Sequence, residues 1–127
     1  MRLYETLENL SYKLRAKSLY YELKYFINKK ESHIKTFTKY NGRQIGKTYN
    51  LMKISGEYRI PVLVSTLSQR ERCVRNYYKF KPIVVTPNEF AIRFKSGTVI
   101  LVDEKQLLDT KTKKMLDGYI QIGFETM

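Results

Sequence analysis

A short glycine-containing segment, residues 42–48, holds the side chains whose types and spacing could do chemistry. Its sequence is Gly-Arg-Gln-Ile-Gly-Lys-Thr. Glycines let backbone N–H groups crowd around phosphate oxygens, and a helix that begins at Thr48 would add the positive end of its dipole. Lys47 would then reach the β- and γ-phosphates of a triphosphate, and the Thr48 hydroxyl would hold Mg²⁺. The segment therefore predicts the end of a phosphate-binding loop.

The loop departs from the standard pattern G-x-x-x-x-G-K-[ST], which requires a glycine five residues before Gly46. Asn41 stands at that position, and Gly42 follows one residue late. Because asparagine tolerates a positive φ better than most residues, the loop could still close. The alternative is a Gly-Lys-Thr triplet that occurs by chance in a basic loop. The expected nucleotide-binding residues are Asn41, Gly42, Arg43, Gln44, Gly46, Lys47 and Thr48.

Flanking elements must position this loop. Residues 33–39 alternate and are rich in β-branched and aromatic side chains, which predicts a strand that leads into it. Residues 48–55 predict a short helix that leaves it and stops at Gly56. Strand, glycine-rich turn and helix is the order that phosphate binding requires.

A second candidate site element is the apolar run of residues 99–102 with its two carboxylates, Asp103 and Glu104. An apolar strand would project Asp103 at its carboxyl end, where ligands bind in open α/β sheets. Asp103 would bind Mg²⁺ and Glu104 would orient an attacking water. One alternative is a strand that ends in a solvated acidic turn. In another, residues 90–102 form a hairpin, and the catalytic strand is residues 119–124 with Glu125 as its carboxylate.

The remaining pattern alternates strands and helices. Short apolar strands are expected at residues 60–65 and 83–85, and a further strand at residues 119–124. Ser68 would cap a helix that runs to about Phe80, with Glu71 completing a capping box, and residues 107–116 are expected to be helical. This predicts an α/β fold with a small, mostly parallel sheet and flanking helices, residues 34–125, in a single domain of residues 1–127.

A long helical segment, residues 1–30, is expected to precede this core. Leu3, Leu7, Leu10 and Leu14 are spaced 4-3-4 along one helix face. The segment fits one long helix, or two with a break at residues 16–18. It would either lie on the sheet of its own domain or bind a partner or a second copy of the chain.

Charge indicates the kind of partner. The formal net charge is +12, and residues 34–100 contain 13 Lys or Arg against 3 Asp or Glu. Such a field favours polyanions, so we expect nucleic acid, DNA more than RNA. The helix from Ser68 would present its cations on one face, with Tyr77 and Tyr78 either in the core or stacked on bases. The alternative is a solvated basic face. The expected nucleic-acid contacts are Arg70, Arg72, Arg75, Lys79 and Lys81.

Several classes of protein are not expected. No apolar run approaches the roughly 18 residues of a membrane span, and the charged N-terminus has no signal-peptide pattern. The single cysteine, Cys73, is expected to be buried, and it permits no internal disulfide, which fits the cytoplasm. The single histidine, His33, cannot build a histidine-based metal cluster.

Residues 43–48 resemble the deviant Walker A motif of phage terminase large subunits, the DNA-packaging ATPases, in which R-Q-x-G-K-[ST] is a frequent form. Residues 99–104 are similar to the Walker B strand of that family. Residues 61–66, followed by a basic helix, are similar to the strand and helix after Walker A in terminases and helicases. The resemblance covers about residues 34–122.

The resemblance implies an additional-strand P-loop ATPase core that uses ATP and Mg²⁺. It implies Lys47 and Thr48 on phosphate and metal, Asp103 on Mg²⁺, Glu104 as the catalytic carboxylate and Arg43 near the γ-phosphate. It also implies a phage protein in the host cytoplasm. A full terminase continues with a coupling motif, more strands and a nuclease domain, and the sequence identifies no arginine finger. A homo-oligomer or a partner ATPase is therefore expected to complete the site.

The sequence thus favours nucleotide binding, with ATP as the expected nucleotide, and Mg²⁺-dependent hydrolysis coupled to nucleic acid. A non-catalytic basic module, in which a degenerate phosphate loop engages nucleic acid or a partner protein, is one alternative. A regulator that mimics an ATPase fold is another.

Overall fold

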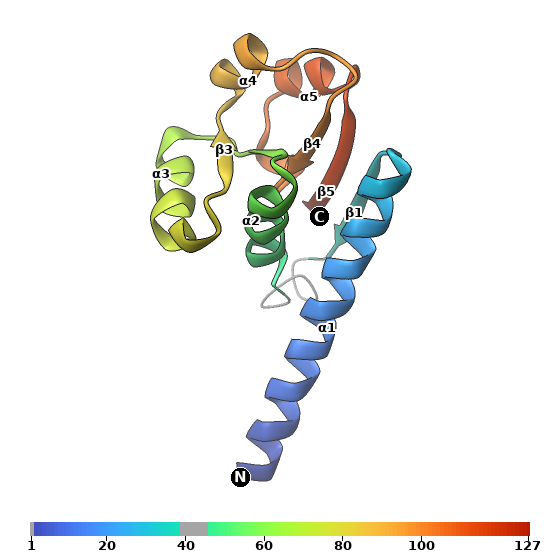
Figure 1. The fold of residues 1–127 in the computed structure, drawn as a ribbon, viewed down its shortest axis with the longest axis vertical. Coiled ribbons are helices and arrows are strands. Elements are labelled where there is room, and N and C mark those ends of the chain that lie inside the picture. The colour runs from blue at the N-terminus through green and yellow to red at the C-terminus, as the bar shows by residue number, and fades with distance from the viewer. Residues whose placement is uncertain (1, 39–45) are drawn as a thin grey trace.

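Five parallel strands form one sheet in the order β1-β5-β4-β2-β3 (Figure 1). The computed structural model describes residues 2–38 and 46–127. The strands are β1 (His33–Phe37), β2 (Pro61–Leu63), β3 (Ile83–Val85), β4 (Val99–Val102) and β5 (Ile120–Thr126). The helices are α1 (Arg2–Lys29), α2 (Lys47–Tyr58), α3 (Leu67–Asn76), α4 (Pro87–Arg93) and α5 (Thr110–Leu116), with short 3₁₀ turns η1 (Tyr78–Phe80) and η2 (Lys105–Leu107). The predicted α/β fold with a long N-terminal helix is confirmed.

Two apolar clusters cover the two faces of the sheet. Successive strand residues point to opposite faces, so Leu101 of β4 joins one cluster while Ile100 and Val102 join the other. The first cluster takes its helical residues from α1, α2 and α3, and the second takes them from α4 and α5. Because helices cover both faces of the sheet, the strands are buried on both sides, which explains why their sequences are short, continuous apolar runs.

Helix α1 is one unbroken helix, and its two halves have different surroundings. Leu19, Leu23 and Ile27 of the C-terminal half are buried against the sheet and α2. The N-terminal half projects away from the sheet (Figure 1). There the predicted leucine stripe is between 52% and 74% exposed. The expectation that the whole helix lies on the sheet is therefore right only for its second half.

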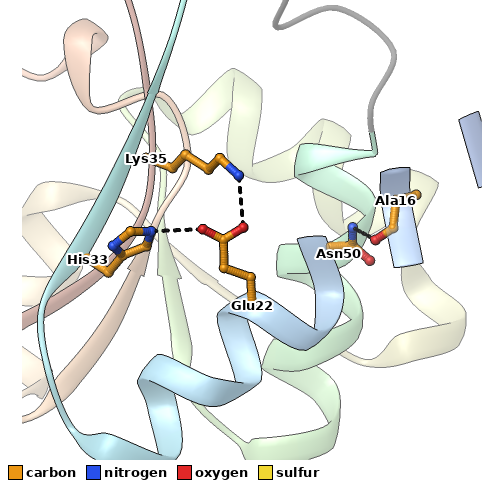
Figure 2. A network of polar contacts seen from close by, with 5 residues as sticks. All are labelled: Ala16, Glu22, His33, Lys35 and Asn50. Carbon is orange, nitrogen blue, oxygen red and sulfur yellow. Dashed lines mark hydrogen bonds and ion pairs between the residues drawn. The ribbon is translucent and has the colours of Figure 1, made fainter. Parts of the chain in front are cut away.

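Polar contacts fasten α1 to its neighbours (Figure 2). The Glu22 carboxylate accepts hydrogen bonds from Lys35 Nζ at 2.8 Å and contacts His33 Nε2 at 3.1 Å, both on β1. Burial raises the pKa of Glu22, but Lys35 and His33 outweigh it, so the pKa lies below its usual value. The buried Asn50 side chain donates to the Ala16 backbone oxygen at 2.8 Å. These contacts set the position of α1 over both β1 and α2.

Some predicted boundaries were wrong for identifiable reasons. Gly56 does not end α2 but lies inside it. Glycine is required there because α2 passes close to η1, and a Cβ on Gly56 would lie 1.8 Å from the Phe80 backbone oxygen. Thr66, not Ser68, caps α3 by accepting a hydrogen bond from the Gln69 backbone N–H. Helix α3 also ends earlier than predicted and is followed by η1.

The hairpin alternative for residues 90–102 is also wrong. Residues 90–93 of its expected first arm belong to α4, a helix that begins with proline at its first position. Strand β4 pairs with β2 and β5, and both pairings are parallel. The apolar run therefore enters the sheet as an interior strand, which leaves Asp103 at its carboxyl end.

Gly123 is a steric requirement of the sheet. A Cβ at this position of β5 would lie 1.9 Å from the Val102 backbone oxygen on β4. We expect Gly123→Ala to lower the free energy of unfolding by about 3 kcal/mol or more, because the two strands would have to separate. Gly118→Ala is the matched control, since its Cβ would meet Ser96 Oγ at an ordinary 3.4 Å. Equal denaturation midpoints for the two variants would contradict this.

Candidate functional site

The start of α2 and the end of β4 meet at the carboxyl edge of the sheet. Gly46, the residue before α2, has φ 77°, a left-handed conformation that favours glycine. Thr48, in the first turn of α2, donates its hydroxyl to the Asp103 carboxylate, with oxygen–oxygen distances of 3.3 and 3.5 Å. Two residues that lie 55 positions apart in sequence are thus in direct contact.

Lys47 lies at the same edge. Its Nζ donates to the Thr126 hydroxyl at 3.2 Å and stands 5.3 Å from the centre of the Phe37 ring. Thr126 is held in turn, because its backbone N–H donates to Gln106 Oε1 at 2.8 Å. The Lys47 ammonium is therefore positioned by the ends of β1 and β5.

A small cavity of about 220 Å³ opens beside the Thr48–Asp103 contact. Glu104 lines it from a left-handed backbone conformation, φ 55°, which is uncommon for a residue with a side chain. Arg72 and Gln69 line it from α3. The cavity thus places two carboxylates, a hydroxyl and a guanidinium around one space.

The electrostatics of this cavity act mainly on Asp103. Burial, followed by the negative charge of Glu104, raises the pKa of Asp103 to about 6. The hydrogen bond from Thr48 and the positive charge of Lys47 act in the opposite direction but do not outweigh them. A carboxyl group whose pKa is raised this far toward physiological pH is typical of a binding or catalytic position.

The structure brings most of the predicted site together. Gly46, Lys47, Thr48, Asp103 and Glu104 all lie at one edge of the sheet. The predicted loop residues Asn41, Gly42, Arg43 and Gln44 lie outside the described residues. Of the predicted loop residues, the structure therefore describes Gly46, Lys47 and Thr48.

The alternative carboxylate, Glu125, occupies a different position. Strand residues alternate between the faces of a sheet. Thr126 contacts Lys47 of α2, and Phe124 packs in the apolar cluster that contains α2 residues, so both lie on the α2 face of the sheet. Glu125, between them, belongs to the opposite face, so it does not share the face of the Thr48–Asp103 contact.

The predicted nucleic-acid residues separate into three kinds of position. Arg70 makes contacts within the chain, donating to the Val84 backbone oxygen at 3.1 Å and pairing with Glu89 at 3.2 Å. Arg72 lines the cavity beside the two carboxylates. The other three, Arg75, Lys79 and Lys81, are exposed.

The neighbouring aromatic and sulfur side chains follow the expectations in part. Cys73 is buried, as predicted, and burial raises its pKa to about 11. Tyr77 is partly buried and lines the cavity, whereas Tyr78 is exposed. Only the first of the two tyrosines therefore belongs to the packed side of this region.

Sequence reasoning missed Thr126, Gln106 and Gln69. Thr126 follows the predicted strand of residues 119–124 by two residues, so it could be placed near the carboxyl edge of the sheet, but its contact with Lys47 depends on the strand order. Gln106 and Gln69 had no such signal, since their roles depend on how a 3₁₀ turn and a helix fold back over that edge.

Comparison with protein-family models, with curated proteins and with solved structures gives no significant match. Within residues 2–38 and 46–127, no group of three or more His, Cys, Asp or Glu side chains is arranged to hold a metal ion. None of the helices in that part of the chain is long and apolar enough to cross a bilayer. The function must therefore be inferred from the geometry of the site.

The pKa of Asp103 predicts how stability depends on pH. Because the folded-state pKa is raised from 3.8 to about 6, ionisation of Asp103 destabilises the fold as pH rises from about 4 to about 6. Asp103→Asn removes this effect. Relative to the original protein, its free energy of unfolding should rise across that window by up to about 3 kcal/mol, measured by denaturant titration without divalent cations.

Glu104→Gln is the companion variant. Since the charge of Glu104 is the second cause of the raised Asp103 pKa, this change should lower the folded-state pKa and so bring down the upper end of the window. A difference between Asp103→Asn and the original protein that stays constant from pH 4 to pH 7 would contradict the assignment.

Proposed function

We propose that this protein binds a nucleoside triphosphate, ATP first among them, together with Mg²⁺, and couples its hydrolysis to work on nucleic acid. The observation that carries the proposal is the contact between the Thr48 hydroxyl and the Asp103 carboxylate at 3.3 Å. It joins the first turn of α2 to the end of β4, the two elements that the sequence patterns assign to phosphate and metal.

The phosphate side of the proposal rests on the start of α2. This helix has 12 residues, and its first N–H groups have no partners within the helix, so it offers an anion-binding end. Gly46 gives the backbone the left-handed turn that such an approach needs. Lys47 supplies a positive charge at the same place, and within the described part of the chain its hydrogen-bond acceptor is the neutral Thr126 hydroxyl.

The oxygen atoms of Asp103 and Thr48 suit a Mg²⁺ ion. Mg²⁺ prefers oxygen ligands and is commonly bound through one or two carboxylates plus substrate phosphates. Asp103 and Thr48 provide a carboxylate and a hydroxyl within 3.3 Å of each other. A bound cation would favour the ionised form of Asp103 and relieve the destabilisation that burial imposes on it. When bound, Mg²⁺ would neutralise phosphate charge.

Hydrolysis is assigned to the cavity residues. Glu104 is adjacent to Asp103 and lines the same space, so its carboxylate would accept a hydrogen bond from the attacking water and orient it. Arg72, which lines the same cavity, would place a positive charge near the transferred group. These roles use only side chains that already face one cavity.

The topology also supports the proposal. Strand β5 lies between β1, which precedes the phosphate loop, and β4, which ends at Asp103. One strand inserted between those two is the arrangement that an additional-strand P-loop core implies. The nucleic-acid part rests on the net charge of +12 and on the exposed cations Arg75, Lys79 and Lys81.

Calorimetric titration tests the binding step. We expect saturable binding of Mg·ATP, and Lys47→Ala should weaken it by about tenfold or more, because a charge contact to phosphate is lost. Asp103→Asn should remove the dependence on Mg²⁺ while metal-free nucleotide still binds weakly. Lys111→Ala, which removes an exposed lysine on α5, is the control and should bind as the original protein does.

Turnover distinguishes an ATPase from a non-catalytic module. Glu104→Gln should retain Mg·ATP binding and lose phosphate release. If nucleotide binds but the original protein releases no phosphate, with or without nucleic acid, the binding-module alternative holds. If no heat is detected with any nucleoside triphosphate, the phosphate-site assignment is wrong.

A further inference from the structure

A groove lies between α1 and α2. Its volume is about 490 Å³, within the range of ligand-binding clefts. It reaches the start of α2, because a Cβ on Gly46 would lie 3.7 Å from the Tyr12 hydroxyl. Three lysines and four tyrosines line it: Lys13, Lys17, Lys53, Tyr12, Tyr20, Tyr21 and Tyr49.

The composition of the groove points to one ligand class. Its lining, taken over the described residues, contains no acidic side chain, so the potential inside it is positive. Aromatic rings between lysines are what single-stranded nucleic acid requires, since bases stack on the rings and phosphates meet the cations. A duplex keeps its bases stacked on one another and would use only the charge.

Not every ring in this region is available for stacking. The Tyr20 ring is covered by Lys53 at 4.8 Å and Lys24 at 5.0 Å, and its hydroxyl donates to Glu57. This hydrogen bond, with burial, raises the pKa of Tyr20 to about 12. In contrast, Tyr12 is 42%, Tyr21 is 56% and Tyr49 is 45% exposed. A base can reach all three rings; Tyr12 and Tyr21 lie on α1, and Tyr49, on α2, also packs edge-on against Phe80.

We propose that the α1–α2 groove binds single-stranded nucleic acid, with Tyr12 and Tyr21 stacking on bases and Lys13 and Lys17 contacting phosphates. The inference deepens the proposed function, whose nucleic-acid partner it specifies, and it moves the main contact from α3 to α1. It differs from the nucleotide site because the groove and the Asp103 cavity share no lining residue.

The test measures binding of a fluorescent single-stranded oligonucleotide by anisotropy, without any nucleotide or Mg²⁺. The double variant Lys17→Gln/Tyr21→Leu should weaken binding by about fivefold or more, as expected for the loss of one stacking ring and one phosphate contact. The matched control is Tyr25→Leu/Lys29→Gln. It has the same spacing on the same helix and the same change in charge, and Lys29 lies 5.0 Å from the Tyr25 ring, outside the groove.

Three outcomes would overturn the proposal. The two double variants could lose affinity equally, a duplex of the same length could bind as tightly as the single strand, or ATP could compete with the oligonucleotide in the original protein. The last result would identify the groove as a pocket for the base of a mononucleotide. The comparison of the two double variants contains no nucleotide. Its result therefore does not depend on whether the proposed phosphate site binds ATP.

A second measurement does not depend on variants. Photocrosslinking of an iodouridine-containing single strand to the original protein, followed by peptide mapping, should label Tyr12 or Tyr21. Labels confined to α3 or η1 would place the contact on the basic helix instead and would overturn the groove assignment.

Discussion

The close approach of β5 to β4 at Gly123 is the constraint on which the carboxyl edge of the sheet depends. With no side chain at Gly123, β5 fits between β1 and β4, although a Cβ there would lie 1.9 Å from the Val102 oxygen. That insertion brings Thr126 beneath Lys47, and it holds β4 in the register that leaves Asp103 opposite Thr48. A packing requirement inside the sheet thus determines which polar side chains meet at its edge.

Those polar side chains are not arranged for stability. Burial and Glu104 both oppose ionisation of Asp103, and Glu104 itself takes a left-handed backbone conformation that non-glycine residues avoid. Folded proteins tolerate such features where the surrounding structure over-determines them, and they cluster at functional sites. The buried residues of the strands are otherwise apolar except for Gln121 of β5, whose Oε1 has no hydrogen-bond partner among the described residues.

The sequence predicted the fold class and placed Thr48 and Asp103 at the same edge of the sheet, because both depend on local patterns. Continuous apolar runs identified buried parallel strands, and the residues that follow them, Asp103 and Glu104, could be placed at the carboxyl edge by the strand rule alone. The features that the sequence could not predict depend on contacts between segments that are far apart in the chain. Gly56 looked like a helix stop, but its lack of a side chain serves the contact between α2 and η1. The pairing of Lys47 with Thr126 needed the strand order, which no local pattern encodes.

The first turn of α2 connects the two proposed sites. Successive helical residues point about 100° apart, so Thr48 can face Asp103 while Tyr49 and Asn50 face the groove. Asn50 also ties this turn to α1 through the Ala16 oxygen (Figure 2). A ligand on either side would order the same backbone and reduce the entropy that the other ligand must overcome. Nucleotide and single strand would therefore favour each other's binding, by thermodynamic reciprocity, without a large movement of the sheet.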